Sequence, residues 1–430
     1  MPNIPRHPLP FPAYYDHARN VYLVEADHGW TQFVKEDLKL QMIEAGWNHD
    51  ENVSLTELNI ELLRLQRANK IDYAGPVAGF RCGIYTMNGM RVLITQSYVP
   101  VAVKQGEWKT IKRLVENLFS RIDHVQTEIF YSWCQVYLKS LKANASMPGQ
   151  ALFLAGPRGC GKSFLQNLLT MLFGGRSGNP WPYMSGETVF NSELFGKEHL
   201  MMEDPPVTKL KDRLEVGARI KQFTVTEQKS CHPKGRVMIM LPSRWRLTCS
   251  INDEPYNLRA IPPLDDSTAD KISILRCHGD SVECRSSDLE VRSEFRKQIE
   301  SELGAFAHFL LNEWEIPEKL RDGRYGVVHY HNPDILKEIE ENSPEFDLLQ
   351  TFDENNIFEH RGCWTGTSKQ LANKLMEYVG DPDAIRFSKS SRSLSLKLAS
   401  LAGKYPERVV YKPIRNKRLW IITKLPPAEG

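Results

Sequence analysis

The sequence lacks any long apolar run. No stretch of its 430 residues reaches about 18 consecutive apolar residues, and the first residues, which include two prolines, an arginine and a histidine, form no apolar signal core. These absences argue against a membrane segment and a secretory leader. We therefore expect an intracellular protein without a membrane partner, located in the cytoplasm of a bacterial host or an equivalent compartment.

Paired cysteines and a strong charge imbalance are also missing. The eight cysteines include no C-x-x-C pair, which argues against a zinc ribbon or a thioredoxin-type site and predicts free, structural thiols. The formal net charge is only +2. Any nucleic-acid surface must therefore be local.

The charge distribution along the chain predicts its organisation. Residues 331–360 are acidic, with Lys337 as the only Lys or Arg, whereas residues 361–424 carry fourteen Lys or Arg against four acidic residues. This reversal indicates an acidic linker followed by a basic domain. The predicted segments are an α+β N-terminal domain of unknown role (1–107), a helical collar for oligomerisation (108–149), an ATPase core with a helical lid (150–330), the acidic linker (331–360) and a basic domain (361–430).

Apolar periodicity predicts some elements within these segments. Before the core, helices are expected from residue 30 onward and over 55–66, and a strand over 91–95. Residues 108–141 are expected to form one continuous helix. A further helix over about 294–314 is expected to close the core.

A glycine-rich segment carries the strongest functional signal. Residues 156–163 read Gly-Pro-Arg-Gly-Cys-Gly-Lys-Ser and fit the phosphate-loop pattern G-x-x-x-x-G-K-[ST], between an apolar strand and a helix start. Backbone N–H groups in this context surround nucleotide phosphates. We expect ATP and Mg²⁺, with Lys162 on the β- and γ-phosphates and Ser163 on the metal; a turn that binds nothing is the alternative. The predicted nucleotide-binding residues are Gly156, Pro157, Arg158, Gly159, Cys160, Gly161, Lys162 and Ser163.

Two further strands are predicted to end at this site. The apolar run 199–202 leads into Glu203 and Asp204, about 40 residues after the loop lysine. Such carboxylates hold Mg²⁺ and activate the attacking water, although the sequence does not divide these roles. A surface strand end is the other interpretation. The strand 246–252 ends in Asn252, whose amide could contact the γ-phosphate or the water.

The order of these three elements within about 100 residues resembles superfamily 3 helicases, the AAA+-type motors of small DNA viruses, phages and mobile elements. The helicase part of phage- and poxvirus-type primase-helicases is the most similar. The resemblance implies an α/β, P-loop AAA+-like core in a ring, usually a homo-hexamer, with the nucleotide between subunits. It also implies a cation donated to the neighbouring subunit: Lys271 stands where arginine is usual, and Arg276 and Arg259 are alternatives.

The same family places a DNA-gripping β-hairpin between the acidic strand and the asparagine strand. Residues 222–226 and 236–240 are the expected strands, and residues 229–235 the basic tip. Lys229, His232 and Lys234 are the candidate contacts to single-stranded DNA. A solvated hairpin without a ligand is the alternative.

The basic C-terminal segment resembles a winged helix-turn-helix, which closes many primase-helicases of this type. It reads as a capped helix starting within 364–375, a helix over 391–401, and strands at 408–411 and 418–422 joined by basic residues. Docking of a protein instead of DNA is the alternative. The candidate DNA contacts are Arg392 and Lys397 on the recognition helix and Arg415, Lys417 and Arg418 on the wing.

Together these features predict an ATP-dependent, ring-forming DNA helicase that acts on single-stranded and forked DNA in the replication of a phage, prophage or mobile element. The N-terminal residues lack the paired acidic motif of a fused primase, so a separate partner is expected to make primers. Two other classes stay open: a non-unwinding origin-binding or loader ATP switch, and an AAA+-like protein remodeller in a defence or regulatory system. The nickase-like sequence His329-Tyr330-His331 lies behind the motor and not in a nuclease context.

Overall fold

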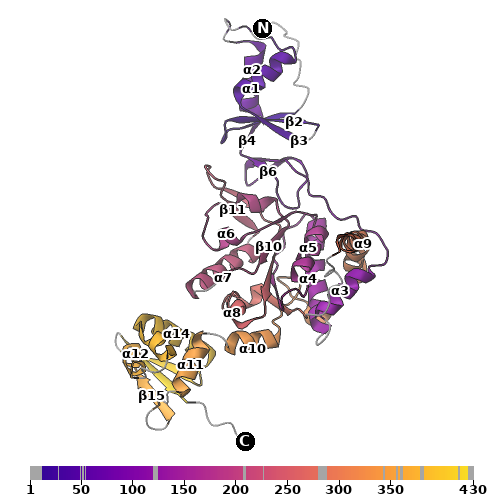
Figure 1. The fold of residues 1–430 in the computed structure, drawn as a ribbon. Coiled ribbons are helices and arrows are strands. Elements are labelled where there is room, and N and C mark those ends of the chain that lie inside the picture. The colour runs from indigo at the N-terminus through magenta and orange to yellow at the C-terminus, as the bar shows by residue number, and fades with distance from the viewer. Residues whose placement is uncertain are drawn as a thin grey trace. The chain divides into compact units, whose positions relative to one another are not determined.

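The computed structural model describes residues 12–27, 29–48, 50, 53, 55–119, 124–206, 210–225, 227–278, 288–341, 344–354, 357–358, 362–377, 382–414 and 417–424. The chain forms two compact units (Figure 1). The first consists of residues 1–253 and 260–332, and the second of residues 254–259 and 333–430.

The first unit begins with an N-terminal module, residues 13–94, built from two small sheets. One sheet has the order β3-β2-β1-β4 and the other β5-β7-β6. Helix α2 packs on the first sheet because Leu58, Leu62 and Leu65 recur at helical spacing and are buried. Residues 30–33, expected to start a helix, instead form a strand, and the helix begins at Lys35. The elements are β1 (Ala13–Asp16), β2 (Val21–Ala26), β3 (Gly29–Phe33), α1 (Lys35–Glu44), α2 (Glu57–Ala68), β4 (Lys70–Ile71), β5 (Tyr73–Gly75), β6 (Gly83–Met87) and β7 (Met90–Ile94).

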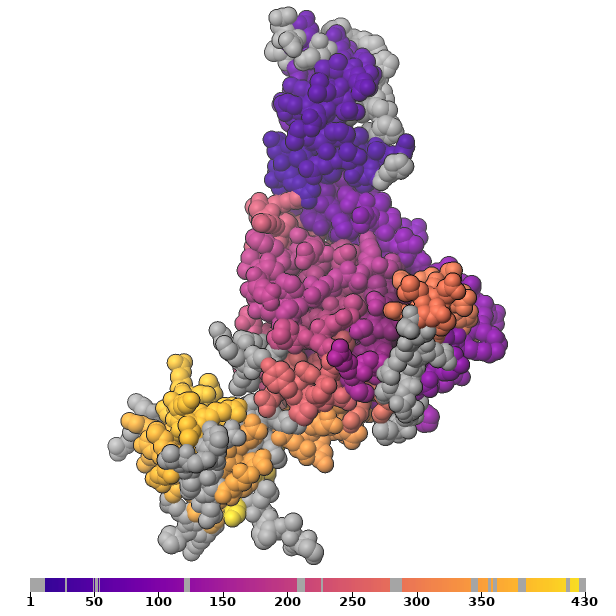
Figure 2. All heavy atoms as spheres, viewed as in Figure 1, coloured from indigo at the N-terminus to yellow at the C-terminus, as the bar shows by residue number. Residues whose placement is uncertain are grey.

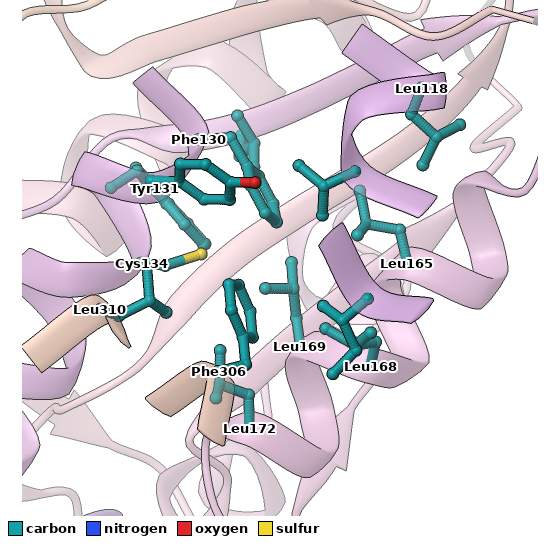
Figure 3. Close-up of a cluster of buried hydrophobic side chains, with 14 of the residues drawn as sticks. Leu118, Phe130, Tyr131, Cys134, Leu165, Leu168, Leu169, Leu172, Phe306 and Leu310 are labelled. Atoms are coloured by element: carbon teal, nitrogen blue, oxygen red, sulfur yellow. The ribbon is translucent and has the colours of Figure 1, made fainter. Parts of the chain in front are cut away.

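A helical layer covers one side of the core. It contains α3 (Lys109–Phe119), α4 (His124–Lys142) and α9 (Leu289–His308), which ends in a π-helical turn, η4 (Phe309–Glu313). The continuous helix expected over 108–141 is described as two helices, and residues 120–123 lie outside the described part. The apolar faces of these helices meet helix α5 in one buried cluster (Figure 3). Figure 3 labels Leu118, Phe130, Tyr131, Cys134, Leu165, Leu168, Leu169, Leu172, Phe306 and Leu310.

A parallel sheet with the order β14-β8-β13-β10-β9 forms the centre of the first unit. Its register pairs Asn252 with Gly156, Glu203 with Ser250 and Arg276 with Ala155. The carboxyl ends of four strands therefore share one edge, and the strands expected at 151–155, 199–203 and 246–252 are confirmed. The elements are β8 (Ala151–Gly156), α5 (Lys162–Leu172), β9 (Ser177–Gly178), α6 (Trp181–Met184), η1 (Ser192–Gly196), β10 (His199–Glu203), α7 (Leu210–Val225), β13 (Arg246–Asn252), η2 (Ala269–Lys271), β14 (Ile272–Arg276) and η5 (Glu318–Leu320).

A two-stranded hairpin lies between β10 and β13 in the sequence, as expected, but its strands differ from the prediction. Strand β11 (Gln228–Cys231) pairs with β12 (Ile239–Pro242), and Cys231 opposite Ile239 closes the ladder. Residues 222–225, expected to be a strand, belong to helix α7. Residues 232–238 form the connection, which we call the hairpin loop.

The second unit combines helices with an antiparallel sheet of order β15-β17-β16. The segment predicted as an acidic linker instead contains two helices, and Leu348, Leu349 and Phe352 of the second helix enter the core of this unit. Residues 363–366 form strand β15, which directly precedes the capped helix predicted within 364–375. The helix begins at Ser368, capped by Thr367. The elements are α8 (Pro255–Leu258), α10 (Pro333–Glu341), α11 (Pro344–Glu354), β15 (Cys363–Gly366), α12 (Ser368–Leu375), α13 (Pro382–Ser388), α14 (Ser391–Lys404), β16 (Val409–Ile414) and β17 (Lys417–Thr423).

The cysteines of the described residues are all free, and Cys284 lies outside this part. Most of these thiols are buried, whereas Cys82 is exposed. Among the described helices, none is both long enough and apolar enough to cross a bilayer.

Candidate nucleotide-binding site

The phosphate loop connects β8 to α5 at the carboxyl edge of the parallel sheet. Gly159 and Gly161 have φ values of 77° and 112°, a left-handed conformation that residues with a Cβ rarely adopt. Gly161 is the N-cap of α5 and provides no side-chain cap. The start of the helix therefore has no side-chain cap at the N-cap position, as in helices that bind phosphate at their N-terminus.

Lys162 is buried at the start of α5 and is held by acceptors on both sides. Its Nζ donates to the carbonyl oxygens of Gly156 (2.6 Å) and Pro157 (3.0 Å). The same Nζ lies 3.1 Å from Oδ1 of Asn252 at the end of β13. The loop lysine and the predicted asparagine are thus in direct contact.

Asp204 follows β10 and completes this network. Its Oδ1 accepts from the backbone N–H of Asn252 (3.0 Å), and its Oδ2 accepts from Nδ2 of Asn252 (3.2 Å). Asp204 has a positive φ of 39°, an uncommon conformation that often marks functional positions. Glu203 and Ser163 are exposed near the same edge of the sheet. The structure therefore brings together Lys162 after the phosphate loop, Asp204 after β10 and Asn252 at the end of β13.

The candidate cations occupy different places. Arg276 ends β14 at the carboxyl edge, and its backbone N–H donates to Oε1 of Gln126 (2.7 Å). Lys271 precedes β14 and so lies at the opposite edge, in an ion pair with Asp270. Arg259 pairs with Asp347 (4.0 Å) in the second unit.

Of the three hairpin residues predicted to contact DNA, only one is exposed. Lys234 is exposed in the hairpin loop, and His232 is half-buried with its backbone N–H on Oδ1 of Asn191 (2.7 Å). Lys229 does not project from the tip: it lies in β11, donates to the carbonyl of Gln222 and places its Nζ 5.6 Å from the Trp245 ring centre. Burial lowers the pKa of Lys229 from 10.5 to about 7.

The N-terminal module contacts the hairpin through an ion pair and hydrogen bonds. In the space-filling view the module, coloured indigo, adjoins the part of the core that contains the hairpin (Figure 2). Arg236 of the hairpin loop reaches the buried carboxylate of Asp16 (3.6 Å), and Asn88 donates to the side chain of Gln228 and to the carbonyl of Met240. Both strands and the loop of the hairpin therefore contact the module, beside a cavity of about 770 Å³.

The predicted contacts of the second unit lie on α14 and the β16–β17 pair. Arg392 and Arg418 are exposed, and Lys397 is half-buried with its Nζ 5.6 Å from the Phe387 ring centre. Lys417 starts β17 opposite Ile414. Arg415 lies outside the described residues.

Several residues around the site were not identified from sequence. Gln126 fixes the end of β14, and Asp253 donates its N–H to the Gly156 carbonyl (3.3 Å). Cys277 contacts the phosphate loop. Asp253 could have been noticed as a carboxylate next to Asn252, but no local pattern marks the other two. The nickase-like motif has a structural role here, because the Tyr330 carbonyl accepts from Ile274 N–H (2.6 Å) beside β14.

Comparison with solved structures identifies the fold. The C-terminal region of NrS-1 in its A-form apo structure matches with a TM-score of 0.54 and 16% sequence identity, and the match covers 96% of each chain. The fold resembles that of the NrS-1 C-terminal region. A second apo structure of this NrS-1 region gives a TM-score of 0.54 at 16% identity, over 96% of this chain and 95% of that chain.

More distant structures add no further support. SCCmec type IV Cch, described as an active helicase, has a TM-score of 0.31 and 10% identity over 92% of this chain and 72% of that one, and so weak a likeness carries no argument. The sequence matches no protein-family model. No curated protein matches it either.

The residues at the sheet edge fit ATP and Mg²⁺. The uncapped start of α5 offers N–H donors for phosphates, and Ser163 and Asp204 are exposed oxygen ligands of the kind that Mg²⁺ prefers. Among the described residues, no cluster of three or more His, Cys, Asp or Glu side chains could hold a metal alone. A bound ion would therefore take its other ligands from the nucleotide and water.

Proposed function

We propose that the protein is an ATP-dependent DNA helicase that works as a ring in the replication of a phage, prophage or mobile element. The observation that carries this proposal is the hydrogen-bonded set of Lys162, Asp204 and Asn252 beside an uncapped helix N-terminus. Motors that hydrolyse nucleotides need a phosphate-binding cation, a carboxylate and a polar group near the γ-phosphate at one edge. The likeness in fold to the NrS-1 C-terminal region, over nearly all of both chains, is compatible with this role.

Each residue of the site has a proposed task. Loop N–H groups and Lys162 would hold the phosphates, and Ser163 and Asp204 would hold magnesium. MgATP supplies the phosphoryl group that is transferred to water. Glu203 and Asp204 share the ordering of that water, and Asn252 links the carboxylate of Asp204 to Lys162. Lys162 must exchange its contacts with the Gly156 and Pro157 carbonyls for phosphate oxygens when nucleotide binds.

The cation in trans is proposed to come from the neighbouring subunit. A residue that serves a neighbour's nucleotide must lie away from its own phosphate loop. Lys271, at the opposite edge of the sheet, meets this requirement better than Arg276. The heterologous interface that results would close into a ring, which we propose to be a hexamer.

DNA contacts are proposed at two places. Lys234 and His232 of the hairpin loop would hold the phosphates of one strand inside the ring, and nucleotide state would move them. In the second unit, α14 with Arg392 and Lys397 would enter a duplex groove, while Arg418 and Lys417 on the β16–β17 wing would contact the backbone. The exposed Arg392 of α14 and Arg418 of β17, in a unit that also contains α12, α13 and a small antiparallel sheet, support this assignment.

ATP hydrolysis with and without single-stranded DNA tests the proposal. We expect hydrolysis that DNA stimulates, and a loss of about 10²–10³-fold in Lys162→Ala because an electrostatic partner of the transferred phosphoryl group is removed. Lys142→Ala is the control: it removes an exposed lysine sixteen residues beyond Gln126 on the same helix, about 24 Å from that end. Hydrolysis that is absent, or that survives in Lys162→Ala, would contradict the proposed site.

A further inference from the structure

Cys160 and Cys277 meet beneath the phosphate loop. Their thiols are hydrogen-bonded to each other, and both side chains are fully buried. Cys160 lies in the loop itself, and Cys277 directly follows β14, more than a hundred residues later. Nucleotide binding does not require thiols at either position.

The backbone keeps the two sulfur atoms together. Cys277 N–H donates to the carbonyl of Ala155 (2.6 Å), and Cys160 N–H donates to the carbonyl of Pro157 (3.2 Å). Gly156 permits the close approach, since a Cβ there would lie 2.4 Å from the carbonyl oxygen of Cys277 and 2.8 Å from its Cβ. A bond between the sulfurs therefore needs no large rearrangement of the chain.

The surroundings favour reaction at Cys160. The hydrogen bond from Cys277 lowers the pKa of the Cys160 thiol, burial opposes it, and Lys162 lowers it further. Lys162 Nζ lies 3.8 Å from Cys160 Sγ. Burial raises the pKa of the Cys277 thiol. Cys160 is therefore the attacking thiol and Cys277 the resolving one.

We propose that Cys160 and Cys277 form a redox modification site that closes as an intramolecular disulfide in the presence of a hydroperoxide. The Cys160 thiolate attacks one oxygen of hydrogen peroxide and breaks the O–O bond, which leaves a sulfenic acid; the released hydroxide takes the proton lost by Cys160 and becomes water. The Cys277 sulfur then attacks the sulfenic sulfur and breaks the S–O bond. Its own proton converts the leaving hydroxide to the second water, so two thiols lose two electrons to one peroxide.

The disulfide would tie the phosphate loop to the end of β14 beside Lys162. Arg158 and Gly159 are exposed above the pair, so a local opening of the loop admits a molecule as small as peroxide. A tethered loop would adjust less well to phosphates, and we expect the oxidised protein to bind nucleotide at least tenfold more weakly. This consequence rests on the proposed function, whereas the disulfide does not.

Peptide mass mapping of the full-length protein tests the site. After treatment with hydrogen peroxide and alkylation of the remaining thiols, we expect a non-reduced peptide pair that joins Cys160 to Cys277 and disappears with dithiothreitol. Cys82→Ser, which removes an exposed thiol elsewhere, should still form the pair. In Cys277→Ala the sulfenic acid of Cys160 should persist and react with dimedone.

Two results would overturn the proposal. One is alkylation of Cys160 and Cys277 as free thiols while Cys82 is oxidised, and the other is a disulfide from Cys160 to a different cysteine. Reduced wild-type protein that binds no nucleotide would instead contradict the proposed function. The mapping result can be read independently of that outcome.

Discussion

At the residue scale, Arg246 shows how a buried charge constrains its neighbours. Its guanidinium is fully buried at the start of β13, stacks on the Tyr137 ring at 4.6 Å and donates to the carbonyls of Met147 (3.0 Å) and Pro148 (3.3 Å). Burial lowers the pKa of Arg246 to about 10. These contacts require the chain at Gly149 to pass directly against the guanidinium.

Gly149→Ala is therefore expected to destabilise the first unit. The added Cβ would lie 2.2 Å from Cζ of Arg246, and displacing a buried guanidinium from its acceptors should cost about 1–3 kcal/mol in the free energy of unfolding. Gly323→Ala is a matched control because its Cβ would meet nothing within 4 Å. Urea unfolding of the two variants measures the difference. Equal midpoints would show that the Arg246 pocket is looser than described.

Lys229 should make stability depend on pH. Its pKa is about 7 in the folded chain and 10.5 ordinarily, so the unfolded state binds more protons between these values. Stability should rise with pH through this window, by at most about 1.4 kcal/mol per pH unit, and this contribution is lost as pH falls through 7. In Lys229→Met the slope between pH 7 and 9 should flatten.

Lys234→Met, which replaces an exposed lysine of the same hairpin, provides the control for this effect. Urea titrations at several pH values should give Lys234→Met the slope of the wild type. The explanation fails if Lys229→Met also keeps that slope, because the half-buried ammonium of Lys229 would then not be its source.

The candidate site residues that could be predicted lie at the ends of parallel strands or in the loop and helix start that follow one. Lys162, Asp204 and Asn252 were found because a loop motif and two apolar strands each point to one sheet edge, and the structure places the three in contact. Lys229 was misplaced because sequence shows its charge and not the Trp245 ring that covers it. Gln126 and Cys277 are far from the phosphate loop in the sequence, and only the fold brings them next to the site.

At the scale of elements, the N-terminal module and the hairpin depend on one another. Asp16 is fully buried, accepts from the N–H of Ala18 (3.1 Å) and has two cationic neighbours, Arg19 (3.5 Å) and Arg236 (3.6 Å). Burial raises the pKa of Asp16. Removing one of these two cations leaves the charge of the buried carboxylate less well compensated.

Arg236→Gln should weaken the contact between the N-terminal module and the hairpin, because it removes the ion pair with Asp16. We expect a loss of about 1–3 kcal/mol in stability and faster amide exchange in β1 and β12, measured by hydrogen exchange with mass spectrometry. Adding Asp16→Asn should cost less than the sum of the single changes, since the two groups interact. Strict additivity together with unchanged exchange in both strands would show that Arg236 and Asp16 do not couple.

Local patterns predicted some elements and missed others for physical reasons. Residues 222–225 look like a strand because they include Thr and Val, yet Val216, Ile220 and Phe223 form a helical face on which Phe223 stacks with Trp245 at 5.2 Å. Strand β15 exists through its pairing with β17, almost sixty residues later, which no local window contains. The acidic segment was predicted as a linker from its charge, but its apolar residues pack in the core of the second unit.

At the scale of the whole molecule, the chain contains a candidate nucleotide site, a hairpin with an exposed lysine in its loop, and a second unit with its own core. We propose that the first two are coupled, because hydrolysis can drive unwinding only if it moves the hairpin along DNA. Lys234 and Lys162 belong to different parts of this coupling. Variants at the two positions should therefore fail differently.

Strand displacement on a forked DNA duplex with ATP and Mg²⁺ tests this coupling. We expect unwinding by the wild type, no detectable unwinding and about 10²–10³-fold slower hydrolysis in Lys162→Ala, and hydrolysis without unwinding in Lys234→Ala. Lys142→Ala should match the wild type. Hydrolysis by the wild type without unwinding of any fork would contradict the proposed coupling and favour a loader or a protein remodeller.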